Sequence, residues 1–148
     1  MEKKGRVPVR EQAPEVRAAN FEEVCYGYNL EEAMVEAERC LNCKVPRCVP
    51  GCPVNINIPA FIMEVKAGNI EEAGRIISLD SALPAVCGRV CPQETQCEAG
   101  CILGIRGEAV AIGKLERFVA DANRNAGVTF DETAPSNGLK VGVVGAGP

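Results

Sequence analysis

Histidine and tryptophan are both absent from the 148 residues, and aromatic residues make up only 4% of the chain. Without histidine, the common zinc sites that combine cysteine with imidazole ligands are excluded. Hydrophobic residues account for 47%, which is enough for a core, but the shortage of aromatics means that this core has to be aliphatic and light.

Signals for membranes, export and nucleic acids are also missing. No stretch of about 18 apolar residues occurs, so no membrane-spanning helix is predicted. The net charge is −4 and no block of Lys and Arg appears, which argues against nucleic-acid binding. The first residues, "MEKKGRVPVREQ", are charged and no apolar stretch follows them, unlike a signal peptide. We therefore expect a cytoplasmic protein, about one domain in size, that binds neither nucleic acid nor membrane.

Cysteine is what the chain has in excess, with nine residues. In a reducing cytoplasm, clustered thiols bind metal more often than they form disulfides. The first group lies in "CLNCKVPRCVPGCP" and consists of Cys40, Cys43, Cys48 and Cys52, with Pro53 after it. The second lies in "CGRVCPQETQCEAGC" and consists of Cys87, Cys91, Cys97 and Cys101. Cys25 stands alone, and we expect it to be a small buried hydrophobic residue rather than a ligand.

The spacing favours iron–sulfur clusters over zinc. Structural zinc sites pair short CxxC-type knuckles, whereas these cysteines come in fours with longer gaps. Two-cluster ferredoxins use a C-x2-C-x2-C-x3-C-P run whose last cysteine serves the other cluster, and residues 40–53 are a widened relative of it. On that pattern Cys40, Cys43 and Cys48 bind one cluster, Cys52 crosses to a second, and Cys101 crosses back. Spacing alone leaves open whether Cys87, Cys91 and Cys97 all bind the second cluster.

Two other functions compete with this interpretation. A zinc-stapled module that docks a subunit would be colourless, whereas an iron–sulfur protein is brown. A thiol redox protein would place a CxxC at the start of a helix in a βαβ unit, but Cys40-x2-Cys43 follows a predicted helix.

Sequence patterns predict short helices around the cysteine loops. The first runs from Leu30 to Cys40, with Ala33, Met34 and Ala37 on one side. "IPAFIMEVKAGN" follows, with Pro59 in its first turn and Gly68 at its end, and then "NIEEAGRIISL" with Asn69 as the expected N-cap. Pro84 opens a short helical turn that carries Cys87 and Cys91. The last helix, "AIGKLERFVADANRNAG", ends at Gly127 and groups five residues on one face, namely Ile112, Leu115, Phe118, Val119 and Ala122.

The final residues, "LKVGVVGAGP", have a different composition. Residues 140–144 have the pattern of a buried strand, and Gly145-x-Gly147 is the start of a G-x-G-x-x-G turn, whose helix binds pyrophosphate. The alternative is an edge strand with a glycine tail. We expect that the remainder of such a domain follows in a longer chain.

These motifs together resemble a known family. "CLNCKVPRCVPGCPVNINIPAFI", "CGRVCPQETQCEAGC", "AIGKLERF" and "KVGVVGAGP" are similar to the N-terminal part of the glutamate synthase small (β) subunit. The same module opens dihydropyrimidine dehydrogenase and the large subunit of NADH-dependent reduced ferredoxin:NADP oxidoreductase. The resemblance implies a mainly α-helical domain with two [4Fe-4S] clusters, followed by domains for FAD and for NAD(P)H.

The resemblance also implies a ligand set. Cys40, Cys43, Cys48 and Cys101 match the ligands of one cluster, and Cys52, Cys91 and Cys97 match three ligands of the other. The fourth is a Gln or Glu in some family members and matches Glu116, which leaves Cys87 near the cluster as a non-ligand. Gly145 and Gly147 match the FAD-binding turn. Gly51, Gly88 and Gly100 are either turn residues or positions where backbone N–H groups approach sulfur.

The predicted organisation follows from both lines of reasoning. It comprises an N-terminal arm (1–29), the α-helical [4Fe-4S] domain (30–127), a linker (128–138) and the start of an FAD-binding domain (139–148). The resemblance implies electron transfer between FAD and a partner site in an NAD(P)H-dependent oxidoreductase, with a large partner subunit. These 148 residues are not expected to be catalytic by themselves, and no residue is assigned as catalytic.

Overall fold

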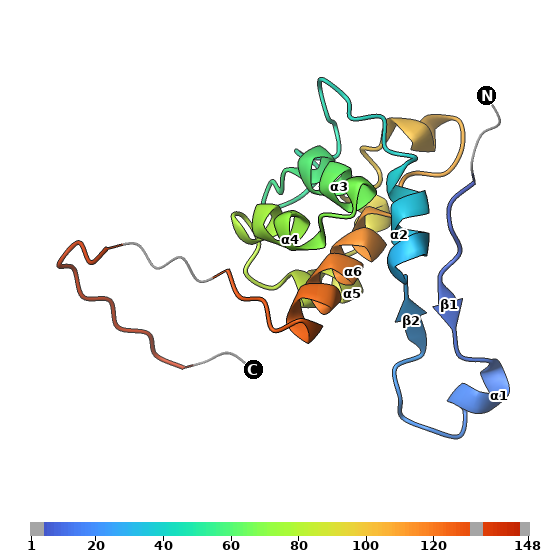
Figure 1. Cartoon of the computed structure of the whole chain (residues 1–148), viewed down its shortest axis with the longest axis horizontal. Helices are drawn as coiled ribbons and strands as arrows, with labels where there is room; N and C mark the ends of the chain where they lie inside the picture. The colour runs from blue at the N-terminus through green and yellow to red at the C-terminus, as the bar shows by residue number, and fades with distance from the viewer. Residues whose placement is uncertain (1–4, 131–134, 146–148) are drawn as a thin grey trace.

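Helices and one short hairpin form the described part of the chain, residues 5–130 and 135–145 of the computed structural model (Figure 1). The expected mainly α-helical class is confirmed. In chain order the elements are β1 Arg10–Glu11, α1 Pro14–Arg17, β2 Cys25–Gly27, α2 Leu30–Ala37, α3 Ile58–Ala67, α4 Ile70–Ser78, α5 Pro84–Val90, the 3-10 turns Gln93–Thr95 and Ile102–Ile105, and α6 Ile112–Asn125.

The ends of α3 follow the residues that predicted them. Pro59 lies in the first turn, where its missing N–H is not needed, and the Asn57 side chain accepts the Ala60 N–H at 3.4 Å. Gly68 ends the helix in the left-handed region at φ +82°, a conformation that glycine adopts without a Cβ clash. Asn69 precedes α4 but does not cap it, because its amide donates to Glu64 at 2.9 Å instead.

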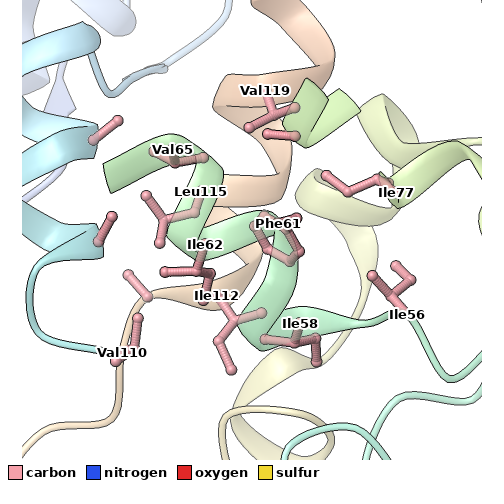
Figure 2. Packing of buried hydrophobic residues seen from close by; sticks show 14 of the residues in the cluster. Ile56, Ile58, Phe61, Ile62, Val65, Ile77, Val110, Ile112, Leu115 and Val119 are labelled. Atoms are coloured by element: carbon pink, nitrogen blue, oxygen red, sulfur yellow. The ribbon is translucent and has the colours of Figure 1, made fainter. Parts of the chain in front are cut away.

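The core lies where α3 and α6 pack together with α2 and α4 (Figure 2). Helix α3 contributes Phe61, Ile62 and Val65, and α6 contributes Ile112, Leu115 and Val119, all fully or almost fully buried. Ala33 and Ala37 bring the α2 backbone close to this layer. Phe118 and Ala122, predicted on the same face of α6, lie at its half-buried border. Apart from Phe61 and Tyr28 the buried core residues are small or aliphatic, as the composition indicated.

Helix α5 lies directly against α6, and a glycine allows the close approach. A Cβ on Gly88 would lie 2.7 Å from the backbone nitrogen of Arg117. Cys87 lies on α5, Cys91 directly follows it and Glu116 lies on α6, so this contact fixes the two cysteines relative to Glu116. Close helix packing therefore accounts for Gly88.

The N-terminal residues, predicted as an arm with little periodicity, contain a two-stranded antiparallel hairpin. β1 pairs with β2, and Tyr28, just after β2, donates its hydroxyl to the Val7 carbonyl at 2.7 Å. Val7 and Val9 pack against the core, and Tyr28 is buried within it. This hairpin has no periodic signal in the sequence, because two- and three-residue strands are too short to show one.

Buried charges, which the sequence did not predict, tie this N-terminal segment to the helices. Glu36 is fully buried on α2 and accepts the backbone N–H groups of Val7 and Ala111, each at 2.8 Å. It also pairs with Arg39, whose guanidinium donates to the carbonyl of Glu108 at 2.6 Å. The predicted helix to Cys40 ends earlier, at Ala37, since the chain turns there and carries Arg39 inward.

Replacing Glu36 with Ala is expected to lower the free energy of unfolding by about 3–5 kcal/mol, the usual cost of leaving a buried charge and its donors without a partner. Urea unfolding of the protein under anaerobic conditions measures the effect. Glu31→Ala, at an exposed position in the first turn of the same helix, is the control and should change the free energy by about 0.5 kcal/mol. Equal effects of the two substitutions would show that Glu36 is not an anchor.

Residues 135–145 form neither helix nor strand, and most of their side chains are exposed. The predicted buried strand 140–144 is therefore not observed here; the first strand of a parallel sheet needs neighbouring strands for its hydrogen bonds. Gly145 has φ +90°, whereas Gly147 lies outside the described residues. Among the described helices, none is both long and apolar enough to span a bilayer.

Candidate metal centre

Four of the predicted ligands line one cavity of about 80 Å³. Cys40, Cys43 and Cys48 come from the first cysteine loop and Cys101 from the second. The walls include apolar side chains from α3, from the start of α6 and from the loop just before it, namely Ile58, Pro59, Ile62, Ile112 and Val110. Four thiols from two loops thus converge in a small, largely apolar space.

Two thiols of this set, Cys48 and Cys40, have a raised pKa. Burial, and after it the neighbouring thiols Cys101, Cys40 and Cys43, raises the pKa of Cys48 to about 11. Burial and the same kind of neighbours also raise the pKa of Cys40. Because burial and like charge both oppose thiolates, these four can ionise together only around a positively charged group, and metal coordination supplies one.

A second set gathers Cys52, Cys91, Cys97 and Glu116. Burial raises the pKa of Cys97 to about 12, and Glu98, Cys52 and Glu116 add to this rise. The pKa of Cys91 is raised by burial, then by Cys87, and further by Glu116 and Cys52. Cys52, from the first cysteine loop, therefore lies with the second group.

Glu116 is the residue of this second set whose surroundings best fit a bound cation. The residue is 7% exposed, and burial raises the pKa of its carboxyl to about 7. Its Oε1 atom is buried and has no hydrogen-bond partner among the described residues. A buried carboxylate without a hydrogen-bond partner costs stability unless it binds a cation, and an iron ion of a cluster would be such a cation. The donors of both sets therefore fit [4Fe-4S] clusters.

Cys87 lies near the second set, but its surroundings differ from those of Glu116. Its thiol lies close enough to Cys91 to raise the pKa of that thiol, and its carbonyl accepts the Gln93 amide at 3.2 Å. The Glu116 carboxylate, by contrast, lies close enough to both Cys91 and Cys97 to raise the pKa of each thiol. This arrangement favours Glu116 as the fourth ligand, and the choice between the two residues stays a prediction.

Two glycines bring the cysteine loops together. A Cβ on Gly51 would lie 2.8 Å from the carbonyl oxygen of Gln96, and a Cβ on Gly100 would collide with the carbonyl of Arg47. Each glycine precedes a crossing cysteine, Cys52 or Cys101. Backbone contact between the loops therefore places each crossing cysteine beside the opposite group, which is a reason for glycine that the sequence did not reveal.

Within the described ranges, no three Cys, Asp or Glu side chains come close enough to bind a single metal ion. A cubane has a different requirement, because each of its four ligands binds a different iron. Cys25 belongs to neither set: it lies in β2, half-buried, and its carbonyl accepts the Arg117 guanidinium at 2.6 Å. Its role as a non-ligand stays a prediction.

Comparison with known proteins supplies the family. The family described as "Dihydropyrimidine dehydrogenase domain II, 4Fe-4S cluster" matches residues 17–128, well over half of the chain. This chain belongs to that family. The resemblance inferred from the cysteine motifs is confirmed, and the chain is an iron–sulfur electron-transfer domain of this dihydropyrimidine dehydrogenase domain II type.

Curated relatives of this iron–sulfur domain are longer proteins. The chain is 37% identical to the glutamate synthase [NADPH] small chain of Halomonas elongata, over 97% of the chain and 31% of that protein. The corresponding small chain of Azospirillum brasilense is 38% identical, over 97% of the chain and 30% of that protein. The NAD-dependent dihydropyrimidine dehydrogenase subunit PreT of Escherichia coli is 36% identical, over 78% of the chain and 28% of that protein. The chain thus spans about a third of the length of these relatives.

Proposed function

We propose that the chain holds two [4Fe-4S] clusters and passes single electrons between FAD and a partner site. Cys40, Cys43, Cys48 and Cys101 would bind the first cluster, and Cys52, Cys91, Cys97 and Glu116 the second. The observation that carries this proposal is the division of the donors into two sets, each of which draws on both cysteine loops. The close backbone contacts of the two loops at Gly51 and Gly100 would hold the two centres at a fixed separation.

Bound clusters would supply one-electron redox chemistry, and the protein residues set the conditions for it. The cysteine thiolates and the Glu116 carboxylate hold the irons. Ile58, Ile62 and Ile112 exclude water from the first site, which lowers the local dielectric constant. A hard carboxylate in place of a soft thiolate gives the second site a different potential from the first. None of these residues acts as an acid, base or nucleophile.

The relatives support a wider proposal for the whole protein. About 70% of each glutamate synthase small chain lies outside the match with this chain. We propose that FAD and nicotinamide domains accompany these residues, with Gly145 and Gly147 in the FAD-binding turn. The relatives' names specify NADPH or NAD and describe a small chain or a subunit. In agreement with these names, we propose that the whole protein is a cytoplasmic NAD(P)H-dependent oxidoreductase, most like glutamate synthase, with a large partner subunit.

The 148 residues by themselves should accept electrons from dithionite but not from NADPH or NADH. Hydride transfer requires a nicotinamide site that faces a flavin. The flavin turn needs a third glycine, a following helix and an acidic residue about 20 residues further on, and this sequence holds only the first two glycines. We expect bleaching by dithionite and none by NADPH, even with added FAD.

The same clusters should become reducible by a pyridine nucleotide when the flavoprotein portion is joined in one chain. Absorbance changes under anaerobic conditions measure both reactions. Stoichiometric FAD binding together with NADPH turnover by the 148 residues would contradict the relay function and indicate a complete small oxidoreductase.

A further inference from the structure

Glu98 is a buried carboxylate next to a predicted ligand of the second cluster. It directly follows Cys97 and is 3% exposed, and its backbone N–H donates to the Gln93 carbonyl at 3.0 Å. Its Oε1 accepts the N–H of Gly113, in the first turn of α6, at 3.3 Å. A full negative charge at this depth would oppose the arrival of an electron at the neighbouring cluster unless a cation balances it.

Arg6 provides that cation from the far end of the chain. Its Nη1 donates to Oε2 of Glu98 at 2.8 Å, and its own side chain is 27% exposed. The family match begins only at residue 17, so this cation comes from outside the matched region.

The backbone around Arg6 is fixed on both sides. The Arg6 N–H donates to Glu108 at 3.0 Å, and the Val7 N–H donates to Glu36 at 2.8 Å. The Val7 carbonyl accepts the Tyr28 hydroxyl at 2.7 Å. Three hydrogen bonds thus hold the segment in register, so the guanidinium is preorganised over Glu98 rather than forming a mobile surface pair.

We propose that Arg6 is a positioning residue for the second cluster: it neutralises Glu98 beside Cys97 and thereby raises the reduction potential of that cluster. The inference rests on the proposed binding of a cluster by Cys52, Cys91, Cys97 and Glu116. It gives the N-terminal segment a role in electron transfer beyond its packing against the core.

The two members of the pair should shift the potential in opposite directions. Arg6→Ala leaves the carboxylate of Glu98 unbalanced and lowers the potential of the second cluster. Glu98→Gln leaves the guanidinium unbalanced and raises it. We expect about a tenfold change in the reduction equilibrium in each direction, which is about 59 mV for a one-electron couple. The double variant should return towards the original potential, and the first cluster should shift less, because Glu98 directly follows Cys97, a ligand proposed for the second.

An anaerobic redox titration followed by electron paramagnetic resonance measures both potentials, after iron has been counted in each protein. Arg10→Ala is the matched control, because Arg10 lies on the same segment but pairs with Glu32 at the surface, with its side chain 52% exposed. It should leave both potentials unchanged. Shifts of opposite sign support the proposal, since structural damage has no reason to change sign between partners.

The outcomes separate this inference from the proposed function. Two results would overturn the role of Arg6 while leaving the proposed function intact, provided that every protein holds two clusters. In one, the second cluster keeps its original potential in both single variants; in the other, both variants shift that potential in the same direction. If the single variants lose the second cluster and the double variant keeps it, the charges of Arg6 and Glu98 compensate each other, as proposed. If all three variants lose the second cluster, charge compensation is contradicted. An original protein without clusters after anaerobic preparation would overturn both the inference and the proposed function.

Discussion

Cys101→Ser is expected to remove the cluster of the first cysteine loop, although Cys101 belongs to the second loop. Iron should fall from about eight to about four atoms per chain, because one of two cubanes is lost. Cys52→Ser should remove the other cluster with the same loss of iron. The physical reason is the contact of the two loops at Gly51 and Gly100, which places each crossing cysteine beside the opposite group.

Double variants identify which cysteines share a cluster. Cys48→Ser with Cys101→Ser should lose no more iron than either single variant, whereas Cys52→Ser with Cys101→Ser should lose nearly all of it. Cys25→Ala is the matched control and should retain about eight iron atoms, as expected for two intact cubanes. The crossing is wrong if Cys91→Ser and Cys101→Ser together remove only one cluster.

Glu116→Ala is expected to remove the second cluster, and Cys87→Ala is expected to leave it in place. Glu116 presents a buried oxygen without a hydrogen-bond partner, beside Cys91 and Cys97. Cys87 lies beside Cys91, but the resemblance to the family matches it to a cysteine that does not bind the cluster. Iron should therefore fall by about four atoms, one cubane, in the first variant only.

A conservative change refines this comparison. Glu116→Gln keeps an oxygen donor of the same reach but removes the negative charge, so the cluster should remain and its potential should rise. Anaerobic iron analysis and redox titration measure both properties. Loss of the second cluster from Cys87→Ala alone would mean that Cys87, not Glu116, is the fourth ligand.

The helices were predictable where local chemistry decides them. Pro59 and Gly68 bound α3, and the spacing of Ile112, Leu115 and Val119 marks the buried face of α6. The Asn29-x-x-Glu32 pattern also forms a capping box at the start of α2, a signal that was present in the sequence and not used.

The buried charges were not predictable from local patterns. Glu36 and Glu98 resemble solvated helix and loop glutamates in the sequence, because their partners lie up to 92 residues away. Arg39 is likewise buried, and Arg6 half-buried, only because those carboxylates are there. Long-range pairs of this kind leave no periodic trace, since burial of a charge depends on its partner rather than on its neighbours in sequence.

The candidate site likewise combines features that local sequence patterns predict with features that only the folded structure reveals. Cysteine spacing predicted two groups and the crossing of Cys52 and Cys101, because a cubane needs a ligand on its far side. Glu116 was predicted as a ligand from the resemblance to a family. Its position on the helix shows only that a glutamate lies beside an apolar face. The role of Gly51 and Gly100 required coordinates, because only the folded backbone brings Gln96 and Arg47 against them.

Metal and sulfide analysis of protein prepared without oxygen tests the two-cluster relay most directly. Iron, acid-labile sulfide and zinc are counted per chain, and the visible spectrum is recorded before and after dithionite. The predicted result is about eight iron and eight sulfide, brown colour and bleaching on reduction, as two [4Fe-4S] clusters require. A colourless protein with about two zinc ions, the content of two tetrahedral structural sites, would contradict it.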